Sequence, residues 1–533
     1  PSDDFVSWTF RQAPKFFDIV TYTGNNGTQT INHNLGSVPG MIIVKRLNDA
    51  GHWGVKHRSI PATKGMFLNQ TAATYTNSTY WGDTEPTSTQ FTVSLTNSVD
   101  SAPYVAYLFA HNDGDGEFGP GQDEDIIKCG SFSHNFNGAE VNLGFEPQWI
   151  LLKAKDQTNN WYIFDAMRGI VTGGLSGDGD AGLIANSSNA ENVTTWGVDL
   201  TSTGFIVYGN NILSSGDAVY MAIRRGPLAA PTDATKVFFV DSGTAANNVL
   251  STGFNPDMSI VGRTTGGSKY VGARLTGSSA YLFTDSTAAE ASYPGWTWDE
   301  SNQFKQGMYN ANNVSWTWKR APSYFDVVAY TGNITSGHTI NHNLGVVPEM
   351  MWVKRRSGVD NWTIYAGDAT SFLRLNTTDQ TFTSNLSWND TAPTSSVFSV
   401  GTEAGTNQSG ANMIAYCFAE KQGYSKISSF VGNGSSNGTY VHLGFRPSFI
   451  LYKVSSASSD WYLQDNKRLT FNVNNTRLEA NNSDAEVTGA ADSIDMLSNG
   501  FKMRHTSSSF NNNGATYIYY AVAENPFVGN DSG

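Results

Sequence analysis

Short apolar runs and alternating apolar and polar positions fill the chain, and no segment shows a sustained helical period. The run Met41–Val44 is apolar at every position, which is typical of a strand buried on both faces. Tyr104–Phe109 and Tyr517–Val522 have the pattern of strands with one face turned to a hydrophobic core. Gly, Pro and Asn separate these segments at short intervals. The pattern predicts an all-β protein of short strands.

Long strings of residues occur twice in the chain. The pairs are Trp8–Asp18 with Trp316–Asp326, Ile31–Gly36 with Ile340–Gly345, and Val141–Pro147 with Val441–Pro447. Matches of this length indicate duplicated structural units. Each copy has a Leu-Gly turn, a Pro and then an apolar run, so each unit is predicted to be a β-sandwich of about 90 to 100 residues.

These repeats divide the chain into five predicted β modules after residues 1–14. They are module 1 (residues 15–112), module 2 (123–226), a divergent module 3 (233–320), module 4 (323–419) and module 5 (424–527). Modules 1 and 4 are sisters, as are modules 2 and 5, and Gly226–Pro231 is the clearest linker. The predicted fold is a tandem, elongated array of jelly-roll-like or immunoglobulin-like sandwiches.

Residues 1–14 match the last strand of a module that the sequence does not otherwise contain. Phe5–Phe10 matches Val314–Trp318, which closes module 3. Two interpretations stay open: a closing strand left by a preceding module of a longer polypeptide, or a donor strand that completes the sheet of a neighbouring molecule. We therefore select four residues for a role in assembly: Phe5, Val6, Trp8 and Phe10.

Composition argues against several function classes. The 533 residues carry a net charge of −13, so no basic surface is available for a nucleic acid. No apolar run is long enough to span a membrane. Cys129 and Cys417 stand at non-equivalent module positions, which gives no support for a disulfide framework or a zinc site.

We predict no catalytic residues and no enzymatic activity. The chain has no H-E-x-x-H or phosphate-loop motif. A polysaccharide depolymerase would need a pair of carboxyl groups. The acids that recur are Asp18 with Asp326, Asp83 with Asp390, and Asp165 with Asp465. Each follows or ends a strand, where Asp caps backbone amides, so a structural role is favoured.

The acidic stretch between modules 1 and 2 is the best candidate for a structural Ca²⁺ site. Asp113, Asp115, Glu117 and Glu124 have the spacing of a calcium loop, and Asp123 adds a further carboxylate. The sixth position, however, is Phe118 where such a loop needs Gly. A solvated acidic linker is therefore the alternative interpretation, and no other cofactor is predicted.

Aromatic side chains that do not recur between modules are candidates for glycan binding. They are Trp196, Tyr293, Trp296 and Trp298. The last three lie in the most divergent module, where a specific surface is expected, whereas the recurring aromatics are expected in the core.

The strings Trp8–Asp18, Asn32–Pro39 and Asp123–Gly130 resemble repeat modules of tail-fibre-like virion structural proteins of marine and freshwater tailed phages, including cyanophages. This resemblance implies an extracellular or virion-surface fibre protein that self-associates and attaches to host cell-surface glycans. It supplies no catalytic motif. Two alternatives are a self-assembling extracellular filament or adhesin subunit, and a carbohydrate-binding or depolymerase protein.

Overall fold

The computed structural model describes most of the chain. The described residues are 5–135, 138–170, 172, 180–192, 197–209, 212–213, 215–243, 249–293, 295–298, 301–306, 312–489 and 493–525.

The predicted all-β fold of tandem sandwiches is confirmed. The described residues form ten antiparallel sheets, and each module contributes one large sheet of five or six strands and one small sheet of two or three. The α-helices are single turns: α1 (Ser78–Trp81), α2 (Asn385–Trp388), α3 (Ala404–Asn407) and α4 (Ser508–Asn511).

Modules 1 and 2 contain strands β1 to β16. In module 1 the strands are β1 (Phe17–Thr23), β2 (Gln29–Asn32), β3 (Met41–Arg46), β4 (Gly54–His57), β5 (Lys64–Phe67), β6 (Tyr75–Thr76), β7 (Gln90–Val93) and β8 (Pro103–Phe109). In module 2 they are β9 (Ile127–His134), β10 (Ala139–Asn142), β11 (Pro147–Ala154), β12 (Trp161–Asp165), β13 (Gly182–Ile184), β14 (Gly197–Thr201), β15 (Gly204–Tyr208) and β16 (Gly216–Arg224). The large sheets have the orders β1-β8-β3-β4-β5-β6 and β13-β12-β11-β16-β9.

Modules 3, 4 and 5 contain the remaining strands. Module 3 has β17 (Phe238–Asp241), β18 (Val249–Ser251), β19 (Met258–Arg263), β20 (Tyr270–Ala273), β21 (Ala280–Phe283), β22 (Ala291–Ser292), β23 (Gln303–Lys305) and β24 (Asn313–Trp318). Module 4 has β25 (Phe325–Thr331), β26 (His338–Asn341), β27 (Met350–Arg355), β28 (Thr363–Tyr365), β29 (Ser371–Arg374), β30 (Phe382–Thr383), β31 (Val397–Val400) and β32 (Asn412–Phe418). Module 5 has β33 (Ser425–Val431), β34 (Tyr440–His442), β35 (Pro447–Val454), β36 (Tyr462–Asp465), β37 (Thr476–Glu479), β38 (Val487–Thr488), β39 (Ile494–Leu497), β40 (Gly500–Met503) and β41 (Thr516–Ala523).

The recurring Leu-Gly string is a turn that only glycine adopts easily. Gly36 and Gly345 have φ values of 74° and 70°, in the left-handed region. Each turn precedes a strand that is buried on both faces, β3 in module 1 and β27 in module 4. The face of each large sheet that points away from the small sheet of its own module is here called the outer face.

The modules are grouped into two compact units. Unit 1 comprises residues 1–170 and 174–228, and unit 2 comprises residues 171–173 and 229–533. In unit 1 a single hydrophobic cluster contains Ile43 and Val55 of module 1 together with Leu151 and Met221 of module 2. Modules 1 and 2 therefore share one core instead of having one each.

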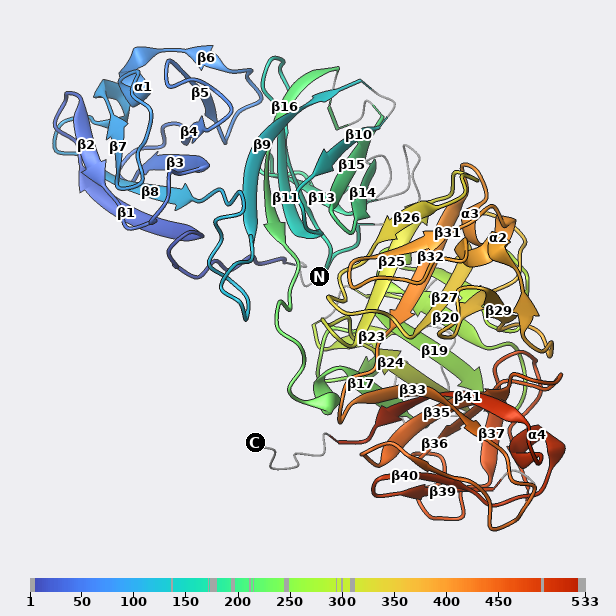
Figure 1. Cartoon of the computed structure of the whole chain (residues 1–533). Coiled ribbons are helices and arrows are strands. Elements are labelled where there is room, and N and C mark those ends of the chain that lie inside the picture. The colour runs from blue at the N-terminus through green and yellow to red at the C-terminus, as the bar shows by residue number, and fades with distance from the viewer. Residues whose placement is uncertain are drawn as a thin grey trace. The chain divides into compact units, whose positions relative to one another are not determined.

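In unit 2 the three modules form a closed group, because each contacts the other two. Figure 1 shows the green strands of module 3 between the yellow and orange strands of module 4 and the red strands of module 5. Trp318 of module 3 lies 6.3 Å from Phe418 of module 4 and 5.5 Å from Phe449 of module 5, measured between ring centroids. Phe418 in turn lies 4.9 Å from Tyr520 of module 5.

Because the modules of each unit pack on one another through buried side chains, we expect limited proteolysis to give two fragments and not five. The segment Gly226–Ala229 between the units is largely exposed, and elastase can cleave after its alanine. Mass spectrometry of a native digest should locate the first cuts close to Leu228. Early cuts between modules 4 and 5, near residue 421, would show that the contacts between these two modules do not protect their connection.

Candidate assembly surface

A tryptophan at the start of a strand joins each module to the one before it within a unit. Its indole Nε1 donates to a main-chain carbonyl oxygen of that preceding module. The pairs are Trp161 with Phe67 at 2.8 Å, Trp362 with Phe283 at 2.7 Å, and Trp461 with Arg374 at 2.8 Å. All three indoles are buried. The acceptor is main chain in every case, so these junctions do not depend on the side chain that the preceding module presents.

A lysine near the end of each central strand makes a second junction. The Nζ atoms donate to main-chain oxygens as follows: Lys153 to Thr71 at 3.0 Å, Lys354 to Thr287 at 3.1 Å, and Lys453 to Thr378 at 3.0 Å. Burial lowers the pKa of each of these lysines to about 8. Each ammonium is held by carbonyl oxygens at a place from which water is excluded.

Contacts between modules 3 and 5 close the group in unit 2. Lys269 Nζ donates to the main-chain oxygens of Asn482 at 2.7 Å and Asp484 at 3.0 Å. Thr284 Oγ1 donates to the Ala480 oxygen at 2.7 Å. Lys269 and Thr284 of module 3 therefore bind module 5, and Trp362 and Lys354 of module 4 bind module 3.

The N-terminal segment, residues 5–12, occupies the position in unit 1 that β24 occupies in unit 2. Trp8 Nε1 donates to Asp165 Oδ2 at 3.1 Å, and Trp316 Nε1 donates to Asp465 Oδ2 at 3.2 Å. An arginine lies over each indole, Arg168 at 5.3 Å and Arg468 at 5.6 Å from the ring centroid. The recurrence of Trp8 and Trp316 thus corresponds to one structural position.

Phe10 of this segment occupies the place of Trp318. Its ring centroid is 5.6 Å from that of Phe109 in module 1 and 6.0 Å from that of Trp149 in module 2. Phe109 and Trp149 are the sister positions of Phe418 and Phe449. Both units therefore have three aromatic side chains at the point where their parts meet.

The strand predicted at Phe5–Phe10 is not paired in the structure. Residues 5–12 belong to no strand, and no backbone hydrogen bond to them occurs among the described residues. The equivalent strand β24 is paired on one edge with β17 and on the other with β19. Within the described part of the chain, no strand is paired with either edge of the segment.

Side chains beside the segment are exposed in unit 1, although their sister side chains in unit 2 are covered. Ile19 is 44% exposed, whereas Val327 is 1% exposed. The other positions repeat this contrast: Trp53 and Tyr107 of module 1, and Ile163 and Leu183 of module 2, are half-buried, whereas Trp362, Tyr416, Leu463 and Leu478 are buried. We call the surface made by Ile19, Trp53, Tyr107, Ile163 and Leu183 the open face. Ile19 is paired with Tyr107 across β1 and β8, and Ile163 is paired with Leu183 across β12 and β13. Exposed apolar side chains that lie beside one another mark an interaction site.

Two junction residues at the open face have no intermodule partner among the described residues. Lys45, the sister of Lys354, donates only to Asp49 and Gly51 of its own module. Trp53, the sister of Trp362, makes no hydrogen bond through Nε1. The assembly residues selected from sequence also lie here: Phe5 is 92% exposed, Val6 is exposed, and Trp8 and Phe10 are half-buried.

In the acidic stretch between modules 1 and 2, several carboxylates contact cations and backbone amides of the same unit. Lys128 contacts Asp113 and Asp125, Lys15 contacts Glu117, and Arg224 contacts Glu124. Asp115 accepts from the Asp113 amide at 3.0 Å. No group of three or more potential metal ligands occurs in the described part of the chain, which includes Asp123. These contacts fasten the stretch to both modules.

The aromatic candidates for glycan binding divide into three cases. Trp296 and Trp298 are buried and pack with Phe304, so the expectation that they form a surface is wrong. Tyr293 is 42% exposed and stays a candidate. Trp196 lies outside the described residues.

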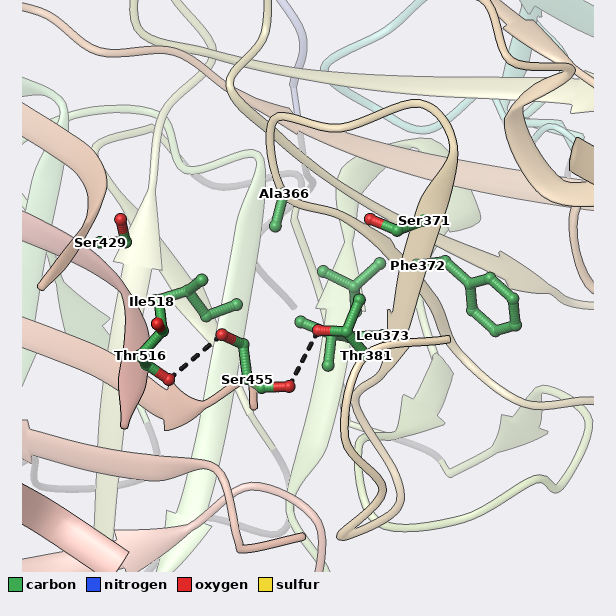
Figure 2. A pocket seen from close by; sticks show the side chains of 10 residues that line it. Ala366, Ser371, Phe372, Leu373, Thr381, Ser429, Ser455, Thr516 and Ile518 are labelled. Atoms are coloured by element: carbon green, nitrogen blue, oxygen red, sulfur yellow. Dashed lines mark hydrogen bonds between the residues drawn. The ribbon is translucent and has the colours of Figure 1, made fainter. Parts of the chain in front are cut away.

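A cavity of about 210 Å³ lies between modules 4 and 5. Figure 2 shows Thr381, Ser455 and Thr516 on one side of it, joined by hydrogen bonds from Thr381 Oγ1 to the Ser455 oxygen and from Ser455 Oγ to the Thr516 oxygen. Ligand pockets usually measure about 300 to 1,000 Å³. The cavity is too small for this class, and the Thr381 hydroxyl beside it joins the two modules.

His57 makes the contact between modules 1 and 2 sensitive to acid. Its Nε2 donates to the Tyr220 oxygen at 3.0 Å, and its Nδ1 accepts from the Ser59 amide at 3.1 Å. Burial, followed by smaller effects of Lys56, Arg58 and His111, lowers its pKa to about 3. The neutral ring is the form that fits both hydrogen bonds.

We expect unit 1 to lose stability as the pH falls below 6.5. The unfolded chain binds a proton at His57 near pH 6.5, whereas the folded chain binds it near pH 3, so the free energy of unfolding falls by at most about 1.4 kcal/mol per pH unit in this window. Thermal unfolding of wild type and His57→Gln at pH 7 and pH 4.5 checks this. The difference in melting temperature between wild type and His57→Gln should be smaller at pH 4.5 than at pH 7. An equal difference at both pH values would exclude His57 as the cause.

None of the helices in the described residues has the length and apolar character needed to cross a bilayer. A family model described as a domain of unknown function (DUF7483) matches residues 11–227 and 231–526. The interruption between the two matched segments falls where unit 1 meets unit 2 in the sequence. No curated protein matches the chain.

Proposed function

The chain belongs to the DUF7483 family, and we propose that it is a structural protein of an extracellular or virion-surface fibre, which works by display and by adsorption to a host surface. The observation that carries this proposal is the use of outer sheet faces for packing between modules. The same faces are covered in unit 2 and open in unit 1. A protein built in this way grows by adding modules or molecules.

Two further observations support a structural role over an enzymatic one. The recurring acids Asp165 and Asp465 each bind the indole of a tryptophan and an arginine, which are contacts that fix packing. The sequence strings of modules 1 and 2 resemble those of tail-fibre-like virion proteins. Among the glycan-binding candidates within the described residues, Tyr293 is exposed and can contact a glycan.

The proposal is tested on the purified chain by measuring its mass over a range of concentrations, with negative-stain electron microscopy of the same samples. We expect particles of fixed mass. The chain should also bind cell-surface polysaccharides without releasing new reducing ends. Release of reducing ends would identify a depolymerase and overturn the proposal. Filaments that lengthen with concentration would favour a polymer subunit.

A further inference from the structure

We propose that the open face of unit 1 binds a third β module of the module 3 type, in which residues 5–12 are the closing strand. Unit 1 then has the same closed group of three modules as unit 2. This inference names the partner of the assembly surface and rests on the proposed structural function. The occupant is the equivalent of β17 to β23, joined ahead of residue 5.

The backbone of the N-terminal segment indicates two flanking strands. In unit 2, β24 pairs through residues 315–318 with β17 and through residues 313–318 with β19. The equivalent positions in unit 1, residues 5–10, have no backbone partner on either edge among the described residues. Two strands are therefore needed, one at each edge, and a single added strand would leave one edge unpaired.

The side chains around the segment are already arranged for this module. Trp8, Phe10 and the Asp165–Arg168 pair occupy the positions of Trp316, Trp318 and the Asp465–Arg468 pair. Trp53 presents the Nε1 group that its sister Trp362 donates to the Phe283 oxygen of module 3. Lys45 Nζ has two acceptors in its own module, and its sister Lys354 has a further one in module 3, the Thr287 oxygen.

A complete module 3 from a second copy of the chain does not fit this place. Its sheet already contains β24 between β17 and β19. That strand would have to occupy the position that residues 5–12 hold against Phe109 and Trp149. The structure therefore favours a module that lacks its closing strand over a second intact copy.

A chimera tests the proposal with the chain's own parts. Residues 229–312 are fused directly to residue 5, so that Asn312 precedes Phe5 as it precedes Asn313 in module 3. The transplanted copy carries Glu290→Leu, because Glu290 pairs with Arg356 in unit 2 and would face Leu47 in unit 1. Hydrogen exchange with mass spectrometry is then compared for residues 5–12 in the chimera and in the unfused chain.

We expect exchange in residues 5–12 to slow by at least about tenfold in the chimera, as amides enter strand pairs. The matched variant Trp53→Ala should reverse part of this protection, whereas His52→Ala, at a neighbouring exposed position, should leave it unchanged. Unchanged exchange in the chimera would overturn the proposal. So would protection of residues 5–12 in the unfused chain that rises with concentration, because a second copy would then be the occupant. Neither outcome depends on glycan binding or hydrolysis, so the proposed function is judged separately.

Discussion

Replacing Trp318 by alanine should destabilise all three modules of unit 2, with a loss of about 3 to 5 kcal/mol in the free energy of unfolding. The indole is fully buried, and its Nε1 donates to Tyr520 Oη at 3.0 Å. Its ring also contacts Phe418 and Phe449, so the cavity created would border modules 4 and 5 as well as module 3. Denaturant unfolding measures the loss, and hydrogen exchange shows where it acts.

The matched control is Phe10→Ala, at the equivalent place in unit 1. Phe10 is only half-buried, so its removal should cost less. In Trp318→Ala, exchange should accelerate in β32 and β41 as well as in β24. Acceleration confined to the strands of module 3 would show that the modules of unit 2 unfold independently.

Replacing Arg468 by methionine should have an effect of similar size, because it leaves a buried carboxylate without its cation. Asp465 accepts from Arg468 Nε at 2.7 Å, and Arg468 also contacts Glu486 at 2.6 Å. The side chain of Asp465 is fully buried. Removing one partner of a buried ion pair typically costs about 3 to 5 kcal/mol. Denaturant unfolding of the variant measures this loss.

Two further variants separate the charge effect from the loss of packing. In Arg468→Met with Asp465→Asn, the buried charge is removed, so part of the stability should return. In Arg168→Met, the same change is made in unit 1, where Glu191 is exposed and the pair is nearer to solvent, so the loss should be smaller. Equal losses for Arg168→Met and Arg468→Met would contradict this account.

The sequence predicted the strands and the duplicated modules well, because these depend on local patterns. Met41–Val44 is a strand buried on both faces, as its run of apolar residues indicates. What covers the outer face could not be predicted, since a run of apolar residues is the same whether a second sheet or a second module packs on it. The structure shows that modules pack on modules, for example through the contacts of Trp161, Trp362 and Trp461.

The error at Trp296 and Trp298 has a physical origin in module 3. An aromatic residue that does not recur between modules can mark a surface, but at these two positions a substitution in the neighbouring strand explains it. Gly272 stands where the sister strand of module 4 has Tyr365, and a Cβ at Gly272 would lie 2.3 Å from the Trp296 ring. A lost side chain in β20 and a new ring that fills its space form a compensating pair. In the sequence, Gly272 within an otherwise apolar strand indicates that a large side chain from elsewhere packs at this position.

The junctions between modules end on carbonyl oxygens, and this choice affects how such a chain can evolve. A side-chain acceptor would have to be preserved whenever a module is copied or exchanged, but every residue type provides the same peptide oxygen. The acceptors of Trp161, Trp362 and Trp461 belong to Phe67, Phe283 and Arg374, three positions that do not share one side chain. Recombination between repeats can therefore place unrelated exposed surfaces next to one another without loss of the joint. For the fibre role proposed above, new outer surfaces can arise in this way while the internal connections persist.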